Sequence, residues 1–189
     1  MTRTSIQPTG PLSRRFDAAS VRDGGGTAFR VESTEAERQA LALECELPGI
    51  EALDADLRIR RDGATGLRVI GTVKARIRQV CVVTLEEFAS DLSETVDVGF
   101  APAAEVEALE AAQAARPPVQ DDEVEPELPD PIVAGRIDLG ALTAEILVLG
   151  LDPYPKKPGV AFAEPEAEAP DEAASPFAAL RGLTAPGGD

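Results

Sequence analysis

The chain of 189 residues lacks histidine and tryptophan and holds one methionine, one tyrosine and two cysteines. Without histidine, Ser/His/Asp and Cys/His catalytic arrangements and histidine-bearing metal sites are excluded. The spacing between Cys45 and Cys81 resembles neither a disulfide framework nor a zinc site. No apolar run of about 18 residues is present to span a membrane. These absences favour a non-enzymatic, cytoplasmic protein with no cofactor, metal or small-molecule substrate.

The N-terminal sequence also lacks the continuous apolar segment of a secretory signal. The stretch MTRTSIQPTGPLSRRF carries Arg and Ser and has no acidic residue before Asp17. An organellar transit peptide therefore remains an alternative to a cytoplasmic location.

Charge is distributed unevenly along the chain. The formal net charge is −16, which argues against a general nucleic-acid binder because phosphate repels such a surface. Residues 56–80 nevertheless contain seven basic and two acidic side chains, a net charge of +5. The sequence thus places a basic island in an acidic protein.

Alternating apolar and polar residues predict β-structure around this island. Residues 57–61 and 67–81 form two such runs, joined by a glycine-containing turn at 62–66. The period of two directs the aliphatic side chains to one face and gathers the basic ones on the other. A third alternating run over 93–102 and a short strand at 27–33 complete the expected antiparallel meander.

Two helices are predicted to pack on this sheet. Thr34 with Glu37 three residues later is a capping-box pattern that begins a helix near 34–47. Asp138 can cap a second helix over 139–149, which the Asp-Pro-Tyr-Pro sequence at 152–155 ends. The expected fold class is α+β, a curved antiparallel β-sheet packed by two helices.

Cys81 ends the second alternating run in phase with the buried aliphatic residues Val73 and Ile77. A nucleophilic cysteine needs a base or cationic partner and some exposure. The alternation sends the nearby Lys and Arg side chains to the other face. The pattern therefore favours packing over a redox or catalytic role.

Two segments are compositionally different from the rest. Residues 103–131 contain nine acidic residues, one arginine and several prolines, which predicts an acidic disordered insertion with a possible helical turn at 104–115. Residues 164–189 are expected to be a mobile C-terminal tail with a short PFAAL motif. We expect one domain over 1–163, because neither side of the insertion has enough large apolar residues for its own core.

Several blocks in this order resemble the bacterial YceD family. They are Cys81-Val-Val-Thr-Leu-Glu86, the downstream IDLGALTAEILVLGLDPYPKKPG, and the terminal PFAAL. Many relatives have a second cysteine where this chain has Thr84, so a CxxC redox or metal site is removed here. They also commonly have proline where this chain has Glu87, which affects only the local turn.

The resemblance implies a ribosome-biogenesis factor that supports accumulation of large-subunit (23S) rRNA, without established enzymatic activity. The expected partners are the large-subunit rRNA precursor or a basic large-subunit ribosomal protein, with no membrane contact. A +5 hairpin could meet phosphate, with poor base specificity because stacking residues are few. The candidate RNA- or partner-binding residues are Arg58, Arg60, Arg68, Lys74, Arg76, Arg78, Asp152, Tyr154, Lys156, Lys157, Phe177 and Leu180.

Three further expectations concern the insertion, the segment around Tyr154 and an alternative function. Two arrangements of the acidic insertion are open: it stays solvated, or it folds over the basic hairpin and neutralises it. Tyr154 is expected to pack its ring in a rigid connection, with Lys156 and Lys157 solvated. The alternative function is an acidic protein-binding adaptor unrelated to ribosomes.

Overall fold

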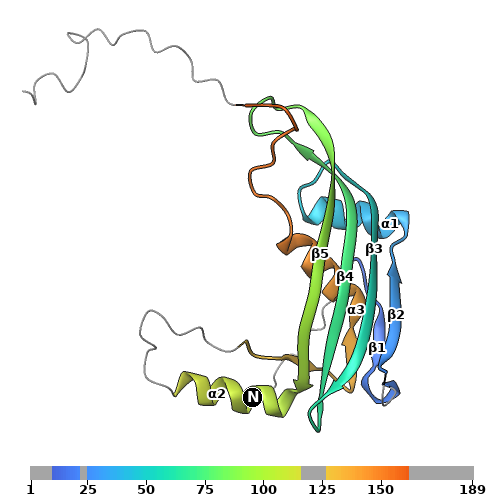
Figure 1. Ribbon diagram of the computed structural model, residues 1–189, viewed down its shortest axis with the longest axis vertical. Coiled ribbons are helices and arrows are strands. Elements are labelled where there is room, and N and C mark those ends of the chain that lie inside the picture. The colour runs from blue at the N-terminus through green and yellow to red at the C-terminus, as the bar shows by residue number, and fades with distance from the viewer. Residues whose placement is uncertain (1–9, 22–24, 116–126, 162–189) are drawn as a thin grey trace, which may run out of the picture. The chain divides into compact units, whose positions relative to one another are not determined.

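The computed structural model describes residues 10–21, 25–115 and 127–161 (Figure 1). Over these residues the chain forms three α-helices, a short 3-10 helix at Ala18–Ser20 and seven strands. The helices are α1 Glu35–Glu44, α2 Ala103–Ala114 and α3 Leu139–Leu149. The strands are β1 Arg15–Asp17, β2 Thr27–Glu32, β3 Gly49–Asp62, β4 Gly66–Val80, β5 Glu87–Pro102, β6 Asp130–Ile132 and β7 Arg136–Asp138.

The main sheet is a long, curved antiparallel meander with one added strand (Figure 1). Its order is β2-β3-β4-β5-β6, and a separate two-stranded sheet pairs β1 with β7. The β3–β4 and β4–β5 hairpins are antiparallel, whereas β6 pairs with the end of β5 in parallel. The predicted α+β class is therefore confirmed, but the expectation of a wholly antiparallel sheet is wrong at β6.

The alternation of side chains sets the two faces of this sheet. Its inner face packs against α1 and α3 in one hydrophobic core. The fully buried side chains include Ile59, Val69, Val73, Ile77, Leu139 and Leu147. On the outer face, the charged residues of β3 and β4 alternate with these positions, as the period of two predicts.

The helix starts follow their sequence signals. Thr34 caps α1 and forms the complete capping box with Glu37. The Asp138 carboxylate caps α3 by accepting the amide N–H groups of Gly140 and Ala141. The two predicted helices and their starts are therefore confirmed. The first is shorter than predicted, because α1 ends at Glu44. In the second, the side chain of Leu149 is exposed.

The ends of the predicted insertion are ordered. Helix α2 begins directly after β5, and β6 lies just before Val133. Residues 116–126 between them lie outside the described part of the chain. The possible helical turn at 104–115 is thus a helix of three turns, and disorder across the whole of 103–131 is a wrong expectation.

Contacts between Cα atoms divide the chain into one unit over Met1–Lys157 and a second over Pro158–Asp189. The single domain over 1–163 stays a prediction, and residues 162–189 lie outside the described part. The helices that the structure describes are all too short or too polar to cross a membrane.

Candidate functional site

The predicted basic side chains lie together on the outer face of the sheet, which we call the stripe. It comprises Arg58 and Arg60 on β3 and Arg68, Lys74, Arg76 and Arg78 on β4. Register explains the grouping, because β3 and β4 are direct neighbours and Arg60 lies opposite Arg68. The predicted location of these residues agrees with the structure.

The stripe is not a field of free positive charge. Arg76 contacts Asp91 on β5 at 2.9 Å and Glu51 on β3 at 3.1 Å. Arg78 contacts Glu87 at 2.8 Å. The register places these acids beside the bases, since Asp91 lies directly opposite Arg76. Carboxylates of the sheet itself therefore neutralise the centre and one end of the stripe.

The hairpin turn repeats this arrangement. Arg68 hydrogen-bonds Asp97 on β5 through its Nε and also lies 3.8 Å from Asp62. The hydrogen bond from Arg68 lowers the pKa of Asp97. In the described residues, the side chains of Lys74 and Arg60 form no hydrogen bond or ion pair, although the charge of Arg60 also contributes to lowering the pKa of Asp97. The Arg58 guanidinium donates to the backbone carbonyl of Gly25.

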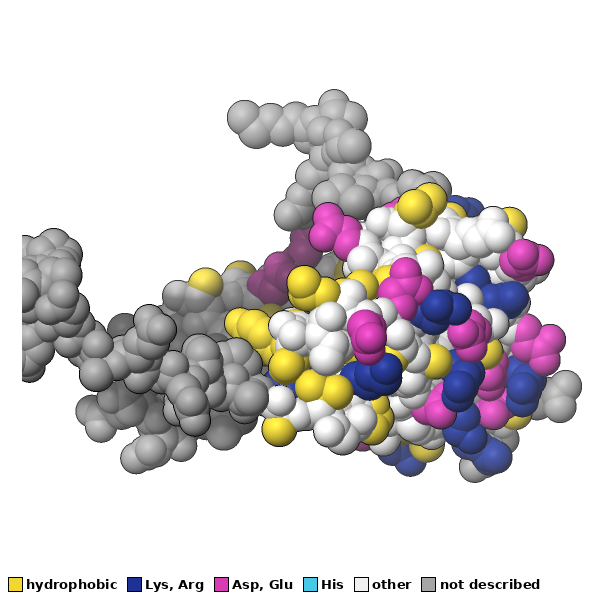
Figure 2. Space-filling view, turned by 90° about the horizontal axis from the view of Figure 1, so that it is seen from above, with side chains coloured by type: hydrophobic (Ala, Val, Ile, Leu, Met, Phe, Trp, Pro, Cys, Tyr) yellow, Lys and Arg dark blue, Asp and Glu magenta, His cyan; other side chains and the backbone are white. Residues whose placement is uncertain are grey.

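The outer face is consequently close to neutral. Besides the stripe it holds Arg30 on β2, so seven bases lie there beside eight acids. Figure 2 shows basic and acidic side chains interleaved rather than separated. The acids are Glu32, Glu51, Asp54, Asp56, Asp62, Glu87, Asp91 and Asp97. The +5 charge of residues 56–80 is offset on this face, because strand pairing brings acids of β2, β3 and β5 alongside the bases.

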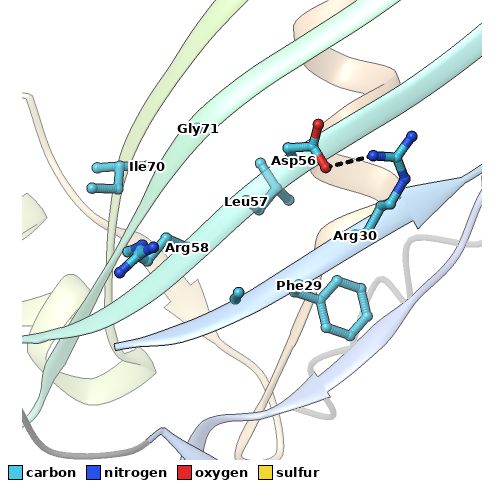
Figure 3. Close-up of a pocket in the computed structure, with 8 residues that line it drawn as sticks. Phe29, Arg30, Asp56, Leu57, Arg58, Ile70 and Gly71 are labelled. Atoms are coloured by element: carbon cyan, nitrogen blue, oxygen red, sulfur yellow. Dashed lines mark hydrogen bonds and ion pairs between the residues drawn. The ribbon is translucent and has the colours of Figure 1, made fainter. Parts of the chain in front are cut away.

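An open groove of about 570 Å³ lies on this part of the sheet, between β2 and β4 (Figure 3). Arg30 points to Asp56 across it, and the two form an ion pair at 2.9 Å. Arg58 lies on the other side of Leu57 in the same view. One end of the groove therefore holds the Arg30–Asp56 ion pair, and the other holds Arg58, which hydrogen-bonds a backbone carbonyl. The groove has no cluster of positively charged side chains.

A second surface forms where the two most specific sequence blocks meet. We call it the clasp, residues 81–86 after β4 and 152–157 after α3. The Val82 amide donates to the Pro155 carbonyl at 3.0 Å, and the Lys157 amide donates to Cys81 Sγ at 3.4 Å. The Lys157 ammonium also contacts Glu86 at 2.9 Å. These contacts join segments 71 positions apart in the chain.

Proline and aspartate residues shape the second half of the clasp. Pro153 and Pro155 cannot donate backbone hydrogen bonds and hold the chain extended. The Asp152 carboxylate accepts the Tyr154 amide at 2.8 Å, which fixes the turn between them. Asp152, predicted as a binding residue, therefore has a shaping role in the structure.

Cys81 is fully buried at the centre of the clasp, in agreement with the packing prediction. Its thiol pKa is lowered to about 7 by the amide N–H of Lys157 first and that of Thr84 second. The sequence did not indicate this hydrogen bonding. Because the sulfur has no solvent exposure, the thiol holds the two segments together rather than facing a substrate.

The clasp displays apolar side chains to solvent. Leu85 is 78% exposed and Tyr154 is 71% exposed, so the expectation that the tyrosine ring packs is wrong. Val82 is also exposed. Leu85 has φ +59°, a left-handed conformation that leucine rarely adopts. The fold therefore holds a strained, exposed leucine at the tip of a hydrogen-bonded turn.

The lysines of the clasp differ from one another. Lys156 is exposed and forms no ion pair with the described residues, as expected, whereas Lys157 is half-buried and paired with Glu86. Val82 and Leu85 were missed as site residues, because the turn conformation and its contact with Pro155 are not visible in sequence. Phe177 and Leu180 lie outside the described residues.

A second hollow lies between β6, β7 and α3, with a volume of about 440 Å³. Phe100, Ile137 and Leu142 line it together with Asp130 and Glu145. Burial raises the pKa of Asp130. The hollow mixes acids with Arg15 and Arg136, so its charge does not indicate a ligand class.

Fold and clasp define an α+β domain whose two most specific sequence blocks are joined in space. The chain matches the family model of the large ribosomal RNA subunit accumulation protein YceD over residues 69–184, and it belongs to the YceD family. That family name gives a role in accumulation of the large ribosomal RNA subunit. No curated protein and no solved structure matched the chain.

Proposed function

We propose that this protein is a non-enzymatic factor that supports accumulation of large-subunit rRNA by binding a large-subunit ribosomal protein. Family membership supports the ribosomal role. The choice of a protein partner over rRNA phosphate rests on one observation, the ion pairing of the stripe. A phosphate group would have to displace the carboxylates that already hold Arg68, Arg76 and Arg78.

The competition between phosphate and the carboxylates for the same arginines favours the protein partner. Affinity for nucleic acid comes largely from phosphates that neutralise free Lys and Arg side chains and release counterions. Paired arginines gain little by exchanging one anion for another. A chain with a net charge of −16 also repels RNA at long range and attracts the basic proteins of the ribosome.

The clasp is the contact surface in this proposal. Exposed aromatic and aliphatic side chains on a rigid support are typical anchors of protein interfaces. Leu85 and Tyr154 are such side chains, and the hydrogen bonds at Cys81 and Pro155 fix the backbone that carries them. Burying them in an interface would offset the free energy that their exposure costs in the free protein.

The structural causes of the shifted pKa values support the proposal that the protein is not an enzyme. Hydrogen bonding to Arg14 lowers the pKa of Glu37 to about 2 in the capping network of α1. Burial opposes ionisation of Asp138, but hydrogen bonds from Ser13 and three amides lower its pKa overall. These two shifts have a structural cause in a cap or ion pair, and the shift of Cys81 comes from backbone amides of the clasp rather than from converging catalytic side chains.

The test is affinity purification of the full chain after crosslinking, at low and moderate salt, with and without RNase. We expect large-subunit ribosomal proteins to be recovered in both salts and after RNase treatment. Replacing Leu85 and Tyr154 by Ala should reduce this recovery, while Leu43→Ala, which removes another exposed leucine from α1, serves as control.

Two results would count against the proposal. If rRNA is recovered, and if RNase treatment removes both the rRNA and all ribosomal proteins from the recovered material, the contact would be on RNA. Recovery of basic proteins without any large-subunit component would favour the adaptor unrelated to ribosomes.

A further inference from the structure

Among the residues that the structure describes, one long edge of β5 has no strand partner. On one side β5 pairs with β4 along its whole length, and on the other β6 pairs only with Phe100–Pro102. Between Glu87 and Val98, no backbone hydrogen bond joins the outer edge to any described residue. At about 3.3 Å per residue, this leaves roughly 40 Å of open strand edge.

Several common protections of an edge strand are missing from this stretch, although the inward-facing Glu94 is a charge of the kind that opposes edge-to-edge pairing. Natural sheets block their edges with lysine, proline, bulges or very short strands. Between Glu87 and Val98, β5 has neither lysine nor proline, and its register with β4 is continuous. By contrast, β2 at the opposite edge is short and carries Arg30.

The charge of β5 selects what can pair with it. The strand contains Glu87, Asp91, Glu94 and Asp97 and no basic residue. Glu87, Asp91 and Asp97 pair with arginines of the stripe, whereas Glu94 forms no ion pair within the described residues. A second copy of the same edge would place like charges together, which opposes self-association. An extended segment with lysine or arginine at alternating positions would be attracted and would complete the backbone hydrogen bonds.

The inner side of this edge also offers room for side chains. A hollow of about 270 Å³ lies between β5 and the segment after α3, lined by Leu92, Glu94 and Lys156 among others. Glu94 forms no ion pair within the described residues and packs beside Gly150. An added strand would therefore present alternate side chains to this hollow and to the acids of the outer face.

We propose that the β5 edge binds an extended basic peptide segment as an added antiparallel or parallel strand. The inference deepens the proposed function, since it rests on a basic protein partner and names how part of that partner is held. The edge acts through backbone pairing. Glu94, which forms no ion pair within the described residues, and the net charge of −16 set the preference for basic sequences. It is distinct from the exposed side chains of the clasp.

The test uses the full chain and a synthetic octapeptide, Lys-Val-Lys-Thr-Lys-Val-Lys-Thr, measured by fluorescence anisotropy at moderate salt. Two matched peptides control for charge and for backbone pairing. One has Glu in place of Lys, and the other has alternate backbone amides methylated. We expect both to bind at least about tenfold more weakly than the first, because either charge or hydrogen bonding is lost.

A matched pair of variants locates the contact. Thr95 on β5 and Thr72 on β4 lie directly opposite each other, but only Thr95 is on the edge strand. Thr95→Lys should weaken peptide binding about tenfold, because lysine blocks strand edges and repels the probe. Thr72→Lys adds the same charge one strand further in and should weaken binding much less. Hydrogen exchange of β5 amides should slow when the peptide binds.

Three results would overturn the inference. They are equal binding of the methylated peptide, equal effects of the two lysine variants, and a dimer in which β5 amides are protected without peptide. If Thr95→Lys fails to fold, the methylated peptide, measured with the unsubstituted protein, still tests whether backbone pairing is needed for binding. Failure of peptide binding with retained recovery of ribosomal proteins removes the edge and leaves the proposed function standing.

Discussion

The stripe and the clasp show opposite relations between exposure and availability. The stripe is rich in charged groups, but most of its arginines are already bound by acids of the same sheet. The clasp also has charged residues, yet it keeps Leu85 and Tyr154 uncovered on a backbone fixed by hydrogen bonds. Exposure alone therefore does not mark a binding surface, and the pairing of each group has to be considered.

Strand β4 supports both regions, so breaking it should give the largest effect. A Cβ atom on Gly71 would overlap the carbonyl oxygen of Asp56 on β3. Gly71→Val should lower the free energy of unfolding by about 3 kcal/mol, because the neighbouring strand must move. Chemical denaturation measures this loss, with Thr72→Val as the control on the next residue. An unchanged midpoint would contradict the close approach of β3 and β4.

The partly buried ion pair of Arg14 and Glu37 should contribute more to stability than the exposed ion pairs of the stripe. Arg14 contacts Glu37 at 2.7 Å, and the pKa of Glu37 is lowered to about 2 from its ordinary value of 4.5. Its stabilising contribution is complete above about pH 4.5 and is lost as the pH falls toward 2. Glu37→Gln should remove this part of the acid dependence and cost about 1 kcal/mol at neutral pH through the cap.

Denaturation curves between pH 2 and 7 measure that difference. The variant Glu35→Gln is the control, since Glu35 lies in the same turn and does not pair with Arg14. Parallel curves for Glu37→Gln and the unsubstituted protein would contradict the role of the pair.

Reversing charges on the stripe should separate paired from unpaired bases. Arg76→Glu would place three carboxylates together and should lower the stability at low salt, with a smaller loss at high salt. Arg60→Glu, which breaks no ion pair among the described residues, should change stability by less than about 0.5 kcal/mol. Equal losses in thermal unfolding would show that the pairing does not matter.

Relieving the strained turn should give the smallest change in stability and a large change in binding. Leu85→Gly suits the left-handed backbone and removes an exposed side chain, so we expect stability to rise by about 0.5 to 1 kcal/mol. Recovery of ribosomal proteins should fall. A more stable variant with normal recovery would remove Leu85 from the contact surface.

Local sequence signals were enough for the hairpins, the helix starts and the burial of Cys81. The alternation around Val73 and the Thr34–Glu37 box depend on neighbours in the chain, so they could be interpreted without the fold. The first part of β5, which includes Phe88 and Ser90, was missed because large apolar side chains are sparse there. The strands β1, β6 and β7 are too short to give a periodic pattern.

The parts that failed depend on non-local register. Asp91 lies 15 positions from Arg76 in the chain, and only the β4–β5 pairing puts them opposite each other. The contact of Val82 with Pro155 likewise joins two distant turns. Composition therefore overestimated the positive charge of the stripe and gave no indication of the clasp.

The salt dependence of binding to a large-subunit rRNA fragment tests the central claim most directly. The variant carries Arg58→Gln, Arg60→Gln and Lys74→Gln, which remove bases without breaking an ion pair of the stripe. If the stripe does not bind phosphate, the slope of log affinity against log salt should be the same for both proteins. A slope reduced by about one unit for each lost base would contradict the account and assign the stripe to RNA.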